Sequence, residues 1–234
     1  LIHRKKLGEL ERISASCQIV FAIQQKIEDF IAPGVTPLEL DRIAETEIRA
    51  LGATPAFKGY QGFPYSICSS VNASIVHGFP DDTPLAAGDI ISIDVGARLD
   101  GYYGDGAFTV GVDAIDSEAQ RLLDGTLACL EMGIVQAQPD GRLSDISNAI
   151  ETHADAQGLA IIREYGGHGI GRKLHESPHI NNYGPPGKGP RLKPGLVFCI
   201  EPILCLGDPE VEHLDDGWTT LTRDRSLAAH SEHT

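Results

Sequence analysis

IISIDVGARLDGYYGDGAF, at residues 90–108, alternates apolar residues with glycines and aspartates. An Asp-Gly pair between two strand-like segments is a strong signal for a two-residue hairpin turn. If Asp100 and Gly101 form that turn, alternation places Asp94 and Asp105 on the same face as diagonal neighbours, roughly 7–8 Å apart at the backbone. Two ionised carboxylates this close repel each other unless they are protonated or share a cation. The hairpin therefore predicts a cation site, provided that the turn has two residues, because a three-residue turn would change the alternation.

Composition excludes several classes of protein. The 234 residues allow one large domain or two small ones, and no window among them resembles a membrane span. Lys and Arg number 19 against 33 Asp and Glu, and the resulting net charge of −14 argues against non-specific nucleic-acid binding. The five cysteines are scattered, odd in number and without a CxxC pair. Together with the lack of a signal-peptide pattern, they predict a reduced, cytoplasmic setting.

The helical pattern suggests an internal duplication. Apolar periodicity predicts four helices, at residues 7–31, 37–52, 117–136 and 144–157. The second is expected to be capped by Thr36, whose side chain can accept a hydrogen bond from the first turn. The sequences at 43–52 and 149–158 are similar, and both end in glycine. We therefore predict one α+β domain, residues 1–234, made of two similar helix-helix-strand halves at 1–113 and 114–234.

Three residues of the second half are candidates to share the cation site. His168 lies between glycines, Glu201 lies in the apolar run LVFCIEPIL, which we expect to be a buried strand broken at Pro202, and Glu232 lies in AHSEHT. Each also has a purely structural interpretation, as a loop histidine or as a solvent-facing glutamate. With the two hairpin aspartates they make four carboxylates and one imidazole, which is more than one ion needs and enough for two divalent ions with bridging carboxylates. This donor set favours Mn, Fe or Co, with Zn as the alternative.

A resemblance to a known family rests on five segments: SVNASIVHGFPDD, GDIISIDVGARLDGYYGDGAFTVG, YGGHGIGRKLHESP, LKPGLVFCIEPIL and SEHT. In this order and near this spacing, they resemble the motifs of the type I methionine aminopeptidases over nearly the whole chain. The resemblance implies the pita-bread fold, an α+β architecture with a duplicated half around a dinuclear metal centre. It also implies a metal-dependent hydrolase that removes N-terminal methionine.

The resemblance assigns roles to the candidate ligands. By resemblance, Asp94 would chelate one ion, and His168 with Glu201 would bind the other. Asp105 and Glu232 would bridge the two ions, and Glu201 would also accept the proton of the attacking water. No cysteine is expected among the ligands. The remaining implied residues contact the substrate: Tyr60, Phe63, Cys68, His77, His175 and Trp218.

Catalysis and specificity are expected to depend on residues beside the metals. By resemblance, His77 and His175 would be catalytic histidines that stabilise charge on the tetrahedral intermediate. Leu174 stands where many members have a larger aromatic residue, so the shape of the methionine pocket would differ there. No partner at the site is evident for the other histidines, His230 among them. The expected substrates are peptides and nascent proteins that begin with methionine and have a small second residue, and the resemblance admits association with the ribosome but not with nucleic-acid sequences or membranes.

Three other interpretations remain open. A proline-specific aminopeptidase or dipeptidase would share the fold and the ligands, although such enzymes usually carry an additional N-terminal domain, for which this chain has no room. A non-catalytic binding protein of the same fold would have lost its metals, and the presence of all five candidate ligands argues against it. The third is a metal-dependent regulatory protein without peptidase activity. Release of methionine from Met-Ala-Ser, with and without a chelator, distinguishes among them.

Overall fold

The computed structural model describes residues 2–234 and contains the four predicted helices. They are α1 (Leu7–Glu28), α2 (Pro37–Ala50), α3 (Ser117–Gln136) and α4 (Leu143–Gln157). The expected cap of α2 is present, because Thr36 Oγ1 accepts a hydrogen bond from the Glu39 backbone N–H at 3.2 Å. The Glu39 carboxylate accepts one in return from the Thr36 N–H at 2.8 Å, which completes a capping box. Thus the helix boundaries follow local signals, although α1 and α2 end at Glu28 and Ala50, slightly earlier than predicted.

The hairpin of β4 (Ile90–Leu99) and β5 (Tyr102–Gly111) has the predicted register over its whole length. Its turn residues Asp100 and Gly101 have φ angles of 49° and 82°. Positive φ at both central residues is what a two-residue hairpin turn of this hand requires. Helix α1 crosses the hairpin so closely that a Cβ at Gly104 would lie 2.6 Å from the Cys17 backbone nitrogen. The hairpin is therefore held between its neighbouring strands and α1.

The strands form four small sheets. The largest has the order β1-β4-β5-β13, with β2 also paired to β4, and the others are β10-β11-β3, β12-β9-β6 and β7-β8. The remaining bounds are β1 (Thr54–Pro55), β2 (Ile67–Val71), β3 (Ser74–Val76), β6 (Ala160–Ile161), β7 (Gly166–Gly169), β8 (Glu176–Asn181), β9 (Ile203–Cys205), β10 (Val211–His213), β11 (Thr220–Thr222), β12 (Ala228–His230) and β13 (Glu232–His233), with a 3₁₀ turn at Tyr60–Gly62.

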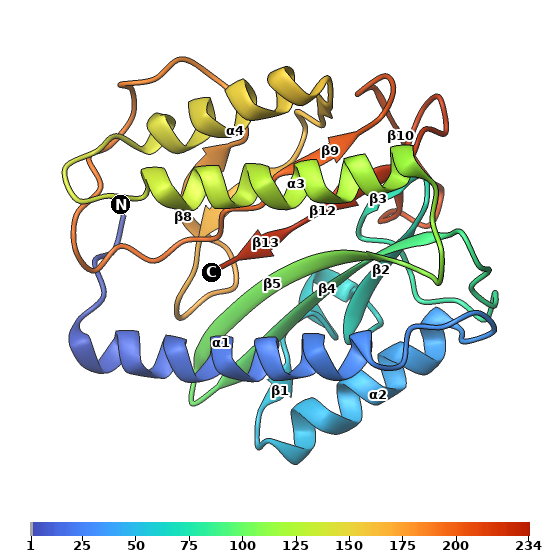
Figure 1. The fold of residues 1–234 in the computed structure, drawn as a ribbon. Helices are drawn as coiled ribbons and strands as arrows, with labels where there is room; N and C mark the ends of the chain where they lie inside the picture. The colour runs from blue at the N-terminus through green and yellow to red at the C-terminus, as the bar shows by residue number, and fades with distance from the viewer. Residues whose placement is uncertain (1) are drawn as a thin grey trace.

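The helices cover the strands from two sides. Figure 1 shows α1 and α2 along one side of the strands, and α3 and α4 along the other. One apolar core lies under each helix pair, with Ile23, Leu40 and Ile93 in the first and Leu122, Ile146 and Leu204 in the second. The two sequence halves also exchange strands, because β13 pairs with β5 and β3 pairs with β11. Within residues 2–234, no helix has the length and apolarity that a membrane crossing needs.

The run LVFCIEPIL differs from its prediction as a strand. Only its end forms one, β9, while Phe198 and Ile200 make single bridges to Gly169 and His233. Pro202 is the physical reason, because it has no N–H to donate to a sheet. Glu201 therefore lies in an irregular segment, where its backbone oxygen accepts a hydrogen bond from Asn182 Nδ2 at 2.8 Å.

Candidate metal centre

A cavity of about 480 Å³ is lined by Leu174 and by all eleven residues that were assigned to the site from the sequence: Tyr60, Phe63, Cys68, His77, Asp94, Asp105, His168, His175, Glu201, Trp218 and Glu232. The carboxylates come from β4, β5, β13 and the segment before β9, and the imidazole of His168 comes from β7. Segments far apart in the sequence thus converge on one place between the two helix pairs.

The hairpin contributes its two aspartates from the same face. Asp105 is only 5% exposed. Burial raises the pKa of Asp94 to about 7, while burial and the charges of Glu232 and Asp94 raise the pKa of Asp105 well above its usual range. Burial is the largest cause of both shifts, and for Asp105 the like charges expected from the alternation add to it.

His168 presents one ring nitrogen to the carboxylates. Its Nδ1 donates to the backbone oxygen of Gly169 at 3.0 Å, so the lone pair is on Nε2. That Nε2 lies 3.8 Å from Asp105 Oδ2 and 3.7 Å from Glu201 Oε1. Burial lowers the pKa of His168 to about 4, which keeps the ring neutral. A neutral imidazole with a directed lone pair is the form that binds a metal ion.

Two glutamates complete the acidic set. Strand β13 pairs with β5 so that Glu232 faces Ala107, close to the hairpin carboxylates. Burial raises the pKa of Glu201, and the charges of Asp94 and Asp105 raise it further. Asp94 Oδ1 and Glu232 Oε1 are buried without a hydrogen-bond partner among the described residues. Unpaired buried carboxylate oxygens at the meeting point of four acidic groups fit divalent cations, which satisfy the oxygens and neutralise the charge.

The structure brings two further side chains close to this centre. The sequence offers no partner for His230, yet its Nε2 lies 3.8 Å from an oxygen of Glu201 and 3.8 Å from an oxygen of Glu232. Cys199 is also close, because its Sγ belongs to a group of possible ligand atoms that includes Asp105, His168 and Glu232. The missed signal is spacing by two: His230 precedes Glu232, and Cys199 precedes Glu201, by two residues, which places each pair on one side of an extended chain.

Cys199 differs from His230 in its protonation. Burial raises the pKa of the Cys199 thiol well above its usual range, and nearby carboxylate charges raise it further. The thiol, not the thiolate, is therefore the stable form at neutral pH, and a thiol is a weak ligand. Its Sγ lies 3.4 Å from Thr234 Oγ1. Burial lowers the pKa of His230 to about 3, so this ring is neutral.

An aromatic wall adjoins the acidic end of the cavity. Phe63 and Trp218 pack edge to face with their ring centroids 5.0 Å apart. Tyr60 Oη lies 2.8 Å from His175 Nδ1, and the His175 ring centroid is 4.3 Å from that of His168. His77 has a positive φ of 58°, which is uncommon for a residue with a side chain. One cavity thus joins an apolar slot, two imidazoles and an acidic centre.

Comparisons with known proteins agree with this arrangement. Residues 11–234 match the model of metallopeptidase family M24. The chain is 48% identical to methionine aminopeptidase 1 of Bacillus subtilis over 226 residues, which cover 97% of this chain and 91% of that protein. The crystal structure of methionine aminopeptidase from Thermotoga maritima superposes with a TM-score of 0.98 at 39% identity, covering 100% of this chain and 94% of that one.

A more distant structure shares the fold alone. The prolidase from Pyrococcus furiosus has a TM-score of 0.80 at 21% identity, over 98% of this chain and 60% of that one. The predicted α+β pita-bread fold is confirmed by these neighbours. Because the family model covers nearly the whole chain and the relatives are this similar, the chain belongs to metallopeptidase family M24.

Proposed function

We propose that this protein is a methionine aminopeptidase that removes N-terminal methionine from peptides and nascent proteins. The observation that carries the proposal is the single cavity in which four carboxylates and His168 adjoin an aromatic slot. The similar proteins support the proposal, because they are named methionine aminopeptidases and the similarity extends over nearly the full length of both chains. Because nascent chains emerge at the ribosome, we also propose that the protein is cytoplasmic and acts on these chains at the ribosome.

The acidic centre would hold two divalent ions. Asp94 would hold one ion, His168 and Glu201 would hold the other, and Asp105 and Glu232 would be shared between the two. The donor set of carboxylates and imidazole suits Mn, Fe or Co, with Zn as the alternative. When bound, such ions supply Lewis-acid chemistry that lowers the pKa of water from 15.7 toward about 7.

The protein's own groups would carry the proton and orient the substrate. Glu201 is the candidate to accept a proton from water and pass it to the leaving amine, because its carboxylate lines the substrate cavity at the acidic centre. His77 and His175 would stabilise charge on the carbonyl oxygen, and Tyr60 holds the His175 ring by a contact at 2.8 Å. The free α-amino group of the substrate would be drawn to the acidic centre. That attraction restricts cleavage to the first residue.

The aromatic slot would bind the methionine side chain. Tyr60, Phe63, Cys68 and Trp218 line it, and a flexible, polarizable thioether suits such a surface. Leu174 is fully buried in the same apolar cluster and leaves more room than an aromatic ring would. We therefore propose somewhat broader tolerance at residue one, poor cleavage after β-branched residues, and a small second residue.

Release of methionine from Met-Ala-Ser tests the proposal. We expect turnover with Mn²⁺ or Co²⁺ and its loss with a chelator, because the acidic centre cannot activate water without a cation. Met-Leu-Ser serves as the control for the second residue, and Ala-Pro for a proline-specific enzyme. Metal-dependent cleavage of Ala-Pro in preference to Met-Ala-Ser would contradict the methionine assignment. If none of the three peptides is cleaved, a binding or regulatory protein would be favoured.

A further inference from the structure

A second imidazole reaches the acidic centre next to Glu201. His230 is only 3% exposed, and its Nε2 has no hydrogen-bond partner among residues 2–234. The nearest oxygens of Glu201 and Glu232 are each 3.8 Å away, which is too far for a hydrogen bond. Leaving a buried nitrogen unpaired is unfavourable. Its position therefore requires a partner that lies between His230 and the two glutamates.

The separations suit one shared cation. Two ligand atoms that each lie 2.0–2.2 Å from an ion can be at most about 4.4 Å apart, and both 3.8 Å distances satisfy this limit. His230, Glu201 and Glu232 also offer ligand atoms that all lie within 4.8 Å of one another. Glu201 points its other oxygen toward His168, at 3.7 Å. We propose that His230 is a further metal ligand, which binds one divalent ion together with Glu201 and Glu232.

The backbone holds His230 in this orientation. Its N–H donates to Thr109 Oγ1 at 3.0 Å, and the Thr109 hydroxyl donates to the His230 oxygen at 2.7 Å. Strand β12 also pairs His230 with Ile203 of β9. The residue is thus fixed between the metal-bearing hairpin and the strand after Glu201. A ring held this way needs little reorganisation to bind an ion.

A second imidazole changes the metals that the centre prefers. Carboxylates suit Mn²⁺ and Mg²⁺, whereas imidazole suits Zn²⁺, Fe²⁺ and Ni²⁺ and binds Co²⁺ more strongly than Mn²⁺. His230 should therefore increase the affinity of one ion site for Co²⁺ and Zn²⁺ more than for Mn²⁺. This inference rests on the proposed metal centre, but its test does not depend on peptidase activity.

Metal titration of His230→Gln tests the assignment. We expect the affinity of one site for Co²⁺ to fall at least about tenfold, as for changes that directly perturb a metal centre, with a smaller change for Mn²⁺. The matched control is His233→Gln, because His233 lies three residues further along, in β13, but is exposed and is not among the residues that line the metal cavity. Equal Co²⁺ affinities in His230→Gln and the unmodified protein would overturn the inference.

A second measurement needs no variant. In the Co²⁺-loaded protein, each metal-bound imidazole should give a paramagnetically shifted, exchangeable N–H signal in the proton NMR spectrum. We expect two such signals, from His168 and His230. A single signal at full loading would overturn the inference, whether or not His230→Gln folds normally.

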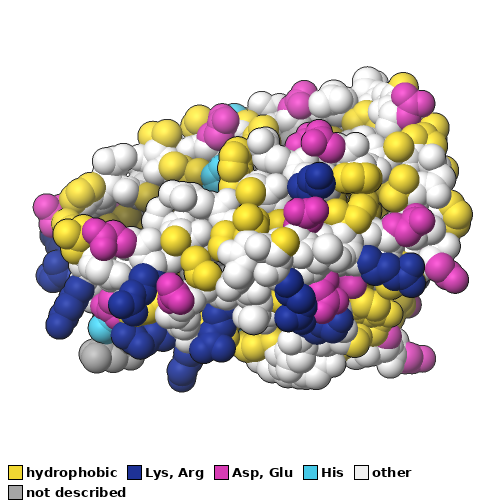
Figure 2. Space-filling model, turned by 90° about the horizontal axis from the view of Figure 1, so that it is seen from below, with side chains coloured by type: hydrophobic (Ala, Val, Ile, Leu, Met, Phe, Trp, Pro, Cys, Tyr) yellow, Lys and Arg dark blue, Asp and Glu magenta, His cyan; other side chains and the backbone are white. Residues whose placement is uncertain are grey.

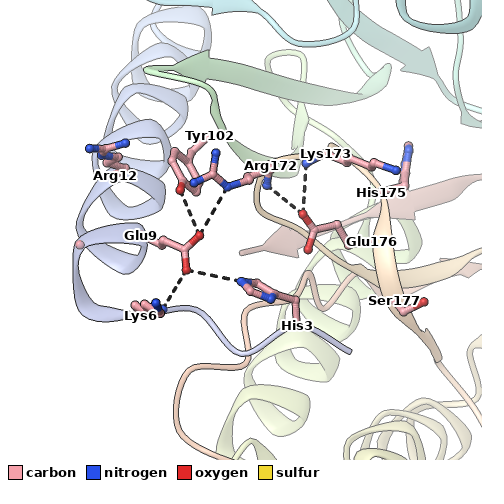
Figure 3. A pocket seen from close by; sticks show the side chains of 11 residues that line it. His3, Lys6, Glu9, Arg12, Tyr102, Arg172, Lys173, His175, Glu176 and Ser177 are labelled. Atoms are coloured by element: carbon pink, nitrogen blue, oxygen red, sulfur yellow. Dashed lines mark hydrogen bonds and ion pairs between the residues drawn. The ribbon is translucent and has the colours of Figure 1, made fainter. Parts of the chain in front are cut away.

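A cationic cleft adjoins the metal cavity and supports an independent inference. It has a volume of about 1070 Å³ and is lined by His3, Lys6, Gly8, Glu9, Arg12, Tyr102, Arg172, Lys173, His175, Glu176 and Ser177. Figure 3 shows these side chains arranged around Glu9 and Glu176. His175 and Glu176 line both this cleft and the metal cavity. The two spaces are therefore neighbours.

Internal contacts already occupy the two carboxylates of the cationic cleft. Glu9 accepts from the Lys6 N–H at 3.0 Å and the Tyr102 hydroxyl at 3.1 Å, and it lies 3.5 Å from the Arg172 guanidinium. Glu176 pairs with the buried ammonium group of Lys5 and accepts from the backbone of Arg172 at 2.8 Å. Among residues 2–234, no carboxylate forms an ion pair with the remaining cations of the cleft: Lys6, Arg12 and Lys173. The cleft is thus positive in a chain whose net charge is −14.

The cationic side chains of the cleft are partly ordered. The Arg172 and Arg12 guanidinium carbons lie 4.8 Å and 5.7 Å from the centroid of the Tyr102 ring, as in cation–π contacts. Figure 2 shows a gathering of Lys and Arg side chains at one end of the molecule, at the left of that view. We infer that the cationic cleft receives substrate residues three and four and favours acidic side chains there. This inference rests on the proposed function, because residue one would occupy the aromatic slot and the chain would leave past His175.

Amidated pentapeptides test the preference. We compare Met-Ala-Asp-Asp-Ser with Met-Ala-Lys-Lys-Ser and expect kcat/KM to be roughly threefold to tenfold higher for the acidic peptide at low salt, as for two exposed charge pairs. The advantage should shrink at high salt because the charges are screened. Arg172→Glu should reduce the ratio, and the control Arg42→Glu, on the exposed face of α2, should not.

The neutral peptide Met-Ala-Ser-Ser-Ser distinguishes a failure of the proposed function from a failure of the inference about the cationic cleft. Its cleavage tests the proposed function alone, whereas the ratio between acidic and basic peptides tests the cationic cleft. Equal kcat/KM for acidic and basic peptides, or an equal fall of their ratio in Arg42→Glu, would overturn the inference about the cleft and leave the methionine assignment intact.

Discussion

Glu201→Gln is expected to lower kcat for Met-Ala-Ser by about 10²–10⁴-fold, the range typical of a lost general acid-base group. Glutamine has nearly the same shape and keeps one oxygen that can bind an ion, but it cannot accept a proton from water. Glu201 is suited to the role because its carboxylate lines the cavity at the acidic centre, with Oε1 3.7 Å from His168 Nε2. The measurement is kcat at saturating metal, together with the metal content of the same sample.

The metal content decides how this result is interpreted. A matched control is Glu118→Gln on the exposed surface of α3, which should leave both quantities unchanged. Unchanged turnover in Glu201→Gln with its metals retained would remove Glu201 from proton transfer. If turnover and one metal ion are lost together, Glu201 acts as a ligand and its role as a base is not supported.

Asp105→Asn is expected to abolish most of the thermal stabilisation that divalent metal gives, and turnover with it. Asn keeps the volume but removes a charge that the proposed bridging position requires. In a chelator the variant should be at least as stable as the unmodified protein, because Asp105 is buried beside the charges of Glu232 and Asp94. Measuring Tm with Mn²⁺ and with a chelator tests both expectations. A normal metal-dependent rise in Tm would contradict the bridging assignment.

The stability of the protein with and without metal should depend on pH. Without metal, the pKa of Asp94 is raised to about 7, against about 3.9 for an unfolded chain. The folded protein therefore binds this proton more tightly, so the stability of the metal-free protein should fall as pH rises from about 4 toward 7. Because metal must displace the proton, metal-dependent stabilisation should grow over the same interval.

Local signals made the hairpin and the helix caps predictable. The Asp100-Gly101 turn determines the register of two adjacent strands, so the common face of Asp94 and Asp105 follows from alternation alone. Thr36 caps α2 as expected, by accepting a hydrogen bond from the Glu39 N–H within one turn of helix. In each case the interacting residues are close in sequence, where few arrangements compete.

Contacts between distant segments could not be derived in this way. Glu232 reaches the hairpin only because β13 pairs with β5, more than one hundred residues earlier in the chain. His230 reaches the same place through other distant contacts, because β12 pairs with β9 and the His230 backbone exchanges hydrogen bonds with Thr109 of β5. The cationic cleft depends on contact between Lys5 and Glu176, which are 171 residues apart. The resemblance to a family implied the roles of the metal ligands, but it indicated neither His230 nor the cationic cleft.

The number and spacing of bound divalent ions test the central claim most directly. We would titrate the metal-free protein with Mn²⁺, count the bound ions at saturation, and record the electron paramagnetic resonance spectrum of the loaded protein. Four carboxylates and His168 in one cavity predict two Mn²⁺ ions per chain, close enough to be magnetically coupled. Saturation at one ion, or two ions with the spectrum of isolated Mn²⁺, would contradict the dinuclear centre.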